Sequence, residues 1–160
     1  MSIRDKNRPP FLQEIEETFK SKMNMQIDHL IKNFCAHLQL KEVPQKDSNG
    51  FYEIQIGISP PIFVKDLTPG LFFRGYLSPI AKEKTYEALF IYLMKGNLMG
   101  QGTGRATLAI DLSEKFFILT QTLSYEADEK VFYETVENFI NYVDFWRDEI
   151  SEILKKEKIL

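Results

Sequence analysis

The sequence predicts an α+β fold in the element order α-β-β-β-α-β-β-α, with an antiparallel sheet packed by helices. Apolar residues recur every three to four positions near both ends of the chain, which is the period of an amphipathic helix. Between residues 51 and 80 the period changes to two, which is typical of strands. With 160 residues, no internal repeat and no long linker, we expect a polar N-terminal segment over residues 1–10 and one domain over residues 11–160.

The first predicted element is a long helix from Phe11 to Leu40. Pro9 and Pro10 can occupy its entry, where a missing backbone N–H group costs nothing. Its apolar residues are spaced to form a single stripe; they are Phe11, Ile15, Phe19, Met23, Ile27, Leu30, Ile31, Phe34 and Leu38. Pro44 and the polar residues 45–50 then break the pattern.

Three strands are expected next, over Phe51–Ile58, Ile62–Leu67 and Leu71–Leu77. The turn sequences Ser59-Pro60-Pro61 and Thr68-Pro69-Gly70 separate them. Such short connections favour an antiparallel meander, because parallel strands need a longer crossover.

A second helix is predicted over about residues 82–98, followed by two strands over Thr107–Leu112 and Lys115–Tyr125. The short turn between these strands indicates a hairpin. Asp128 is a suitable N-cap for a last helix that reaches about Lys156. Its apolar residues alternate four and three apart over about three heptads, which suits either a helix lying across the sheet or a coiled coil. We favour packing on the sheet.

Composition excludes several classes of function. The 23 acidic and 20 basic residues give a net charge of −3, so nucleic acid is not an expected partner. Cys35 is the single cysteine, which rules out an intrachain disulfide and a thiolate zinc site. The sequence has no apolar run of membrane-spanning length and no apolar stretch near Met1, so we expect no membrane insertion and no export.

The sequence offers no convincing catalytic, metal or cofactor constellation. Residues 100–104 are rich in glycine, but their spacing and their position between a helix and a strand do not match a phosphate-binding loop. We therefore expect Gly100 to end the second helix. His29 and His37 are too far apart to share a metal ion, and Cys35 is expected to be buried. Asp111 and Glu114 fall in a hairpin turn, where exposed carboxylates are common.

Aromatic residues are abundant, with 13 Phe, 7 Tyr and one Trp. From composition alone they fit equally an aromatic-rich core and an exposed surface that binds other proteins.

The segment of residues 90–111 resembles the signature of the class I type III secretion chaperones, the CesT-like (Tir chaperone) family. In that family a helix ends in a leucine-rich run and an Asn, and a glycine-rich turn then leads to a strand that ends in Asp. The matching residues here are Asn97, Gly100, Gly102, Gly104 and Asp111. Phe139, Ile140 and Trp146 extend the resemblance into the last helix, whereas Arg105 stands where a small residue is expected.

This resemblance implies a non-catalytic homodimer in the bacterial cytoplasm. Each dimer would bind the N-terminal region of a secreted effector in extended form, through surface grooves and an added strand, and keep it soluble and competent for export. The secretion ATPase or sorting platform is a further partner that the resemblance implies. No cofactor, metal ion, nucleic acid or membrane is expected.

The same resemblance suggests which residues carry the two contacts. For effector binding these are Leu12, Ile15, Phe19, Met23, Ile54, Ile56, Phe63 and Phe73. For the dimer interface they are Tyr86, Phe90, Met94, Leu98, Thr107, Leu108, Ala109 and Ile110.

Two other functions stay open at this stage. A cytoplasmic adaptor of the same fold would regulate the secretion apparatus or transcription by binding a folded partner. A small-molecule enzyme would need a cleft that gathers groups such as His37, Asp111 and Glu114.

Overall fold

The computed structural model describes residues 9, 18, 27–40, 42–67, 70–81 and 86–157, and the chain divides into two compact units between Val43 and Pro44. The first unit contains a helix over residues 27–37. Its end is capped by the N–H groups of residues 38 and 40, which donate to the carbonyl oxygens of Phe34 and Cys35. The predicted helix is thus confirmed over residues 27–37, and the rest of it before residue 27, Thr18 apart, lies outside the described residues. Cys35 is buried, as expected, and burial raises the pKa of its thiol.

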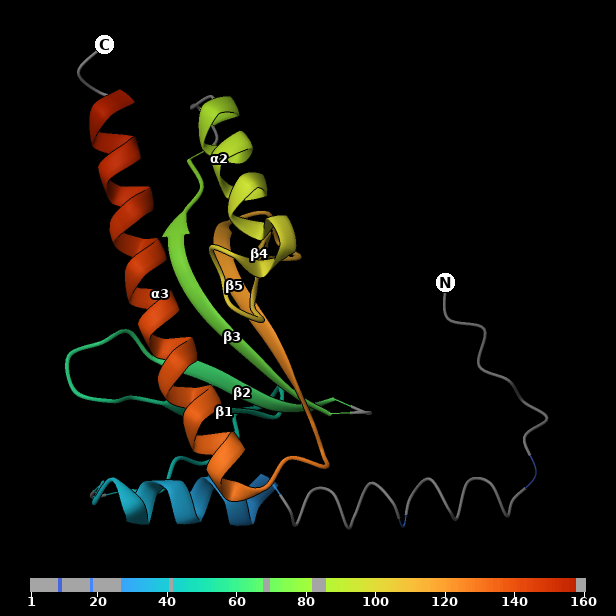
Figure 1. Ribbon diagram of the computed structural model, residues 1–160. Coiled ribbons are helices and arrows are strands. Elements are labelled where there is room, and N and C mark those ends of the chain that lie inside the picture. Colours follow the sequence, from blue (N-terminus) through green and yellow to red (C-terminus); the bar gives the residue numbers. More distant parts are fainter. Residues whose placement is uncertain are drawn as a thin grey trace. The chain divides into compact units, whose positions relative to one another are not determined.

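The second unit, residues 44–157 of the described chain, is built on a five-stranded antiparallel sheet (Figure 1). Its strands are β1 (Phe51–Ile54), β2 (Ile62–Leu67), β3 (Gly70–Pro79), β4 (Thr107–Ile110) and β5 (Phe116–Ser124). They lie in the spatial order β1-β2-β3-β5-β4. Three helical segments accompany them: α2 (Glu87–Asn97), the 3₁₀ turn η1 (Leu98–Gly100) and α3 (Glu129–Glu157). This arrangement confirms the predicted class, the antiparallel pairing and the order of the elements from β1 onward.

The predicted first strand is too long, because β1 ends at Ile54 and not at Ile58. Gly57 has a φ of +58°, so the chain turns there. The Gln55 side chain donates to the Gly57 carbonyl oxygen over 3.2 Å, and Ile58 is fully exposed. The same loop is tied to α3 by Ser59 Oγ, which donates to Asp144 Oδ2 over 2.7 Å. The alternation of apolar and polar residues therefore continues to Ile58, although the pairing of β1 with β2 ends at Ile54.

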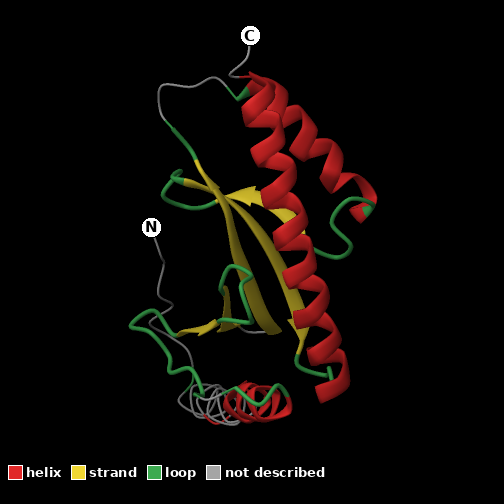
Figure 2. Ribbon diagram, turned by 90° about the vertical axis from the view of Figure 1, so that its left-hand side faces the viewer, coloured by secondary structure: helices red, strands yellow, loops and turns green. Residues whose placement is uncertain are grey.

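Helices α2 and α3 lie on the same side of the sheet, which we call the helix face (Figure 2). Along α3 the predicted apolar stripe is buried as far as Ile150, whereas its last member, Ile153, is half-buried; the buried members are Phe132, Val136, Phe139, Val143, Trp146 and Ile150. The Phe73 ring of β3 stacks between two of them, with its centroid 6.0 Å from that of Phe132 and 5.8 Å from that of Phe139. Packing of the last helix on the sheet is thus confirmed, and Asp128 caps it by accepting the Val131 N–H over 2.9 Å.

A glycine sets how closely α3 approaches the sheet. A Cβ atom on Gly75 would lie 2.4 Å from Val143 Cγ2, which is closer than nonbonded carbons can come. Any side chain at this position would therefore push the helix away from β3.

Candidate functional site

Asn97, the last residue of α2, fastens that helix to strand β4. Its Nδ2 atom donates to the Leu108 carbonyl oxygen over 3.0 Å, and its Oδ1 atom accepts the Leu108 N–H over 2.8 Å. The side-chain amide thus satisfies both backbone groups of one strand residue, as a neighbouring strand would. At neutral pH only an amide side chain has a donor and an acceptor in this fixed arrangement.

The glycines near Asn97 make room for the Trp146 indole. A Cβ atom on Gly96 would lie 2.5 Å from the ring, and one on Gly102 would lie 3.3 Å from it. The indole Nε1 atom donates to the Gly102 carbonyl oxygen over 3.0 Å. These glycines therefore serve close packing between α2, α3 and the loop before β4, and not the binding of phosphate.

The end of α2 differs in detail from the expectation. The helix stops at Asn97, and Gly100, with a φ of +69°, ends the 3₁₀ turn that follows. Met99 also has a positive φ, of 54°, and its side chain is 87% exposed. The chain thus reverses over η1 before it enters β4.

Asp111 closes the hairpin between β4 and β5. Its carboxylate accepts the Lys115 and Phe116 N–H groups, each over 2.8 Å, together with the hydroxyl and N–H of Ser113. These bonds, led by that of the Ser113 hydroxyl, lower the pKa of Asp111 to about 2. A carboxylate held so firmly in its charged form is a turn-forming group and a poor general acid.

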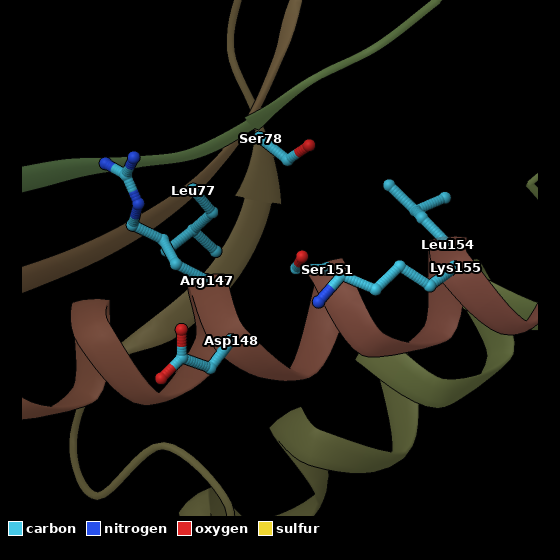
Figure 3. Close-up of a pocket in the computed structure, with 7 residues that line it drawn as sticks. All are labelled: Leu77, Ser78, Arg147, Asp148, Ser151, Leu154 and Lys155. Atoms are coloured by element: carbon cyan, nitrogen blue, oxygen red, sulfur yellow. The ribbon is translucent and has the colours of Figure 1, made fainter.

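A hollow of about 490 Å³ lies between the end of β3 and the C-terminal half of α3 (Figure 3). Its lining consists of Leu77, Ser78, Arg147, Asp148, Ser151, Leu154 and Lys155. Ser151 and Lys155 have the spacing of a nucleophile and a base, but Lys155 Nζ donates to Glu152 Oε1 over 2.7 Å. This bond raises the pKa of the lysine, whereas a catalytic base needs a lowered one. Within the described chain, no three His, Cys, Asp or Glu side chains are placed to hold a metal ion.

The side of the sheet opposite the helices carries a continuous group of aromatic rings around one arginine. We call it the aromatic face, and its members are Phe51, Phe63, Phe72, Arg74, Tyr76 and Phe116. Neighbouring rings meet edge to face, with centroids 5.1 Å apart for Tyr76 and Phe116 and 5.4 Å apart for Phe63 and Tyr76. All six side chains are partly exposed. In the unit of residues 44–157, both described helices lie on the other side (Figure 2).

A second apolar surface is formed by α2 and the adjoining edge strand β4. Helix α2 buries Leu89 and Leu93 against its own unit, yet its opposite side is also apolar. The exposed side chains there and on β4 are Phe90, Ile91, Met94, Leu98, Met99 and Ile110, which are 37–87% exposed. A helix that is apolar on both sides is usually buried on both sides. We call this surface the α2 patch.

The sequence profile of the Tir chaperone protein (CesT) family matches residues 29–147, which is most of the chain. The protein belongs to the CesT family. Its members are non-catalytic chaperones of type III secretion. In the part of this chain that resembles the family signature, Asn97, the glycines near it and Asp111 hold the fold together.

Individual relatives are distant in sequence. A Chlamydia pneumoniae protein, CPj0713/CpB0740, is 23% identical over 126 residues, which span 78% of this chain and 96% of that protein. A chain of the HopA1-SchA chaperone-effector complex matches with a TM-score of 0.62 and 17% identity, over 79% of this chain and 97% of its own. A chain of the ExsC-ExsE complex matches with a TM-score of 0.63 and 15% identity, over 78% of this chain and 92% of its own.

A third solved structure, the heterodimeric ExoU-SpcU complex from the type III secretion system of Pseudomonas aeruginosa, gives a TM-score of 0.57 and 14% identity. The match covers 74% of this chain and 93% of that one. At such identities these structures show a shared fold and no more. No described helix is long and apolar enough to cross a membrane.

The structure places the expected effector-binding residues in three different settings. Leu12, Ile15, Phe19 and Met23 lie outside the described residues. Ile54 and Phe73 are buried on the helix face, at 1% and 0% exposure, so within this unit they cannot serve as outward contacts. Ile56 is half-buried just after β1, and Phe63 belongs to the aromatic face.

The residues expected at a dimer interface divide in a similar way. Phe90, Met94, Leu98 and Ile110 belong to the exposed α2 patch, and Thr107 is exposed on the edge strand. Ala109 is half-buried. Tyr86 and Leu108 are buried within their own subunit, at 5% and 3% exposure.

Sequence reasoning missed most of the aromatic face. Of its six residues only Phe63 was expected to take part in binding. The available signal was the alternation of Phe72, Arg74 and Tyr76 along β3, because residues two apart on a strand share a face. Arg74 marks that face as the less buried one, since arginine is almost never fully buried without a partner.

Proposed function

We propose that this protein is a type III secretion chaperone that binds the N-terminal region of a secreted effector in extended form. In the bacterial cytoplasm it keeps this region soluble and competent for export. The aromatic face is the observation that carries the proposal, because partly exposed rings on a sheet are unusual unless something covers them. Family membership supports it, and so does the HopA1-SchA complex, in which a chaperone and an effector are bound together.

The sheet also offers an edge to which an extended segment could add a strand. Strand β4 pairs with residues 117–120 of β5, and β5 continues to Ser124 with β3 as its described partner. Beside this free edge lies a hollow of about 460 Å³ between β5 and α3. Backbone pairing there would supply affinity with little dependence on sequence, which suits a chaperone.

For the effector-binding residues we keep Ile56 and Phe63 of the original expectation, together with Leu12, Ile15, Phe19 and Met23. Wrapping a disordered segment costs about 2–5 kcal/mol of ordering, so a chaperone needs a large contact area. A homodimer doubles the available surface.

The α2 patch is the proposed dimer interface, centred on Met94. Packing α2 of one protomer against its partner would bury the side chains that are now 37–87% exposed. Met94→Glu should convert the dimer to a monomer in multi-angle light scattering, because it would bury an unpaired charge. Val131→Glu is the matched control, since Val131 is 41% exposed on α3 and outside the patch. If both variants have the same mass as the native protein, α2 is not part of a dimer interface.

The function is tested by purifying the tagged full-length protein from its source bacterium and identifying the bound partner by mass spectrometry. A secreted protein bound through its N-terminal region supports the proposal. Recovery of folded apparatus proteins, such as the secretion ATPase or sorting platform, with no secreted protein would favour the adaptor function.

A further inference from the structure

The guanidinium of Arg74 lies at the centre of the aromatic face and is enclosed by rings. Its Cζ atom is 4.3 Å from the Phe51 centroid, 4.9 Å from that of Tyr76 and 5.3 Å from that of Phe63. Stacking on several rings fixes the plane of the guanidinium, so its donors point in set directions.

One of these donors, Nε, lacks an acceptor among the described residues. Arg74 Nε is buried and has no hydrogen-bond partner within the described chain. A buried donor without a partner destabilises the fold, and native proteins rarely leave one unless something else supplies the acceptor. The rings attract the charge but cannot take the place of an oxygen acceptor.

The surroundings are short of negative charge. Among the strand residues on this side of the sheet, Glu53 is the single carboxylate, and it stands exposed on β1 with Phe63 between it and Arg74 in the ladder. Lys65 adds a second positive charge, with its Nζ atom 5.1 Å from the Phe51 centroid. The aromatic face is thus locally cationic although the whole chain has a net charge of −3.

We infer that the aromatic face selects a partner segment in which an Asp or Glu is flanked by apolar side chains. The carboxylate would pair with Arg74, and the flanking side chains would contact the rings. Arginine and carboxylate form two parallel charge-assisted hydrogen bonds, which are stronger and more directional than neutral ones. This inference rests on the proposed function and adds to it a chemical rule for the segment that is bound.

A random library of 16-residue displayed peptides tests this rule with the full-length protein as bait. The native protein should enrich peptides that contain Asp or Glu between apolar residues. Arg74→Met keeps an apolar stem over the rings, so it should keep the apolar preference and lose the acidic one. Arg74→Glu should enrich Lys or Arg instead. Lys156→Met and Lys156→Glu change the charge equally at an exposed site near the end of α3, away from the aromatic face and from both hollows, and they should select the same peptides as the native protein.

The peptide that the native protein selects best then serves as a fluorescent probe. We expect Arg74→Met to weaken its binding at least tenfold and Lys156→Met to leave it within twofold. A twin peptide with Lys in place of its acidic residue should bind Arg74→Glu better than it binds the native protein. Thermal unfolding of each variant checks that its fold is intact.

Three results would overturn the inference: no selected peptide, selected peptides without acidic enrichment, or an acidic preference that survives Arg74→Glu. The proposed function is judged separately, by recovery of a secreted partner. If Arg74→Glu recovers that partner as well as the native protein does, the chaperone function stands and the role of Arg74 is refuted. The first of the three results would also fit the aromatic face being covered by residues 1–26 or by a second copy of the chain.

Discussion

The amide of Asn97 is expected to be among the most sensitive polar groups of the fold. Asn97→Ala removes two hydrogen bonds, of 2.8 and 3.0 Å, and leaves both backbone groups of the buried Leu108 without their partner. At about 1 kcal/mol for each bond, and more for a group left unsatisfied, the free energy of unfolding should fall by about 2–4 kcal/mol. In a protein of this size that loss lowers Tm by roughly 6–12 °C.

Asn97→Asp tests the same contact with almost no change in shape. At neutral pH the carboxylate can still accept the Leu108 N–H, but it faces the Leu108 carbonyl oxygen and repels it, so we expect a loss of about 2 kcal/mol. Below about pH 4 a protonated carboxyl can donate to that oxygen, and the difference from the native protein should narrow. Asn97→Ala has no carboxyl to protonate, so its loss of stability should not become smaller at low pH through this contact.

Urea unfolding at several pH values measures the free energy of unfolding of each variant relative to the native protein. Asn141→Ala, at an exposed position of α3, is the matched control and should change the free energy of unfolding by less than about 0.5 kcal/mol. A variant Asn97→Asp that is as stable as the native protein at pH 7, or that has the same loss of stability at pH 3 as at pH 7, would contradict the role of this amide.

Three further changes test other parts of the fold. Asp111→Asn should destabilise the protein above about pH 4. The folded pKa of Asp111 is about 2, below its ordinary 3.8, so the stability difference between the variant and the native protein should shrink as the pH falls from 4 to 2. Urea unfolding at several pH values measures this difference, and a constant value would contradict the expectation. Thr103→Val removes a fully buried hydroxyl that has no partner among the described residues, so the free energy of unfolding should stay equal or rise by about 1–2 kcal/mol; a loss above 1 kcal/mol would reveal a hidden bond. Gly75→Ala should cost about 1–3 kcal/mol by displacing α3, and Val143→Ala in the same chain should recover part of that loss in a double-mutant cycle; strict additivity would refute the contact.

The elements could be predicted from sequence because their signals are local. The stripe of α3, its Asp128 cap and the hairpin turn at Asp111 each depend on neighbours within a few positions. The ends of elements were less secure. Gly57 ends the run of alternating residues that follows Phe51, and nothing in the apolar pattern marks where the pairing with β2 stops.

The faces of the sheet could not be assigned from sequence. Strand β3 reads Leu71, Phe72, Phe73 and Arg74, so it is apolar on both sides, and alternation alone does not say which side meets a helix. Phe73 was therefore expected to face outward, although it packs under α3. The cluster around Arg74 depends on the register of three strands, which sequence periodicity does not specify.

The most direct test of the central claim is limited proteolysis of the complex that this chaperone forms with its partner. We expect that a stretch near the partner's N-terminus survives digestion only while bound, and that the same stretch is unfolded by circular dichroism once released. A partner that is folded on its own, with no stretch protected by the complex, would contradict the claim that this protein holds an effector in extended form.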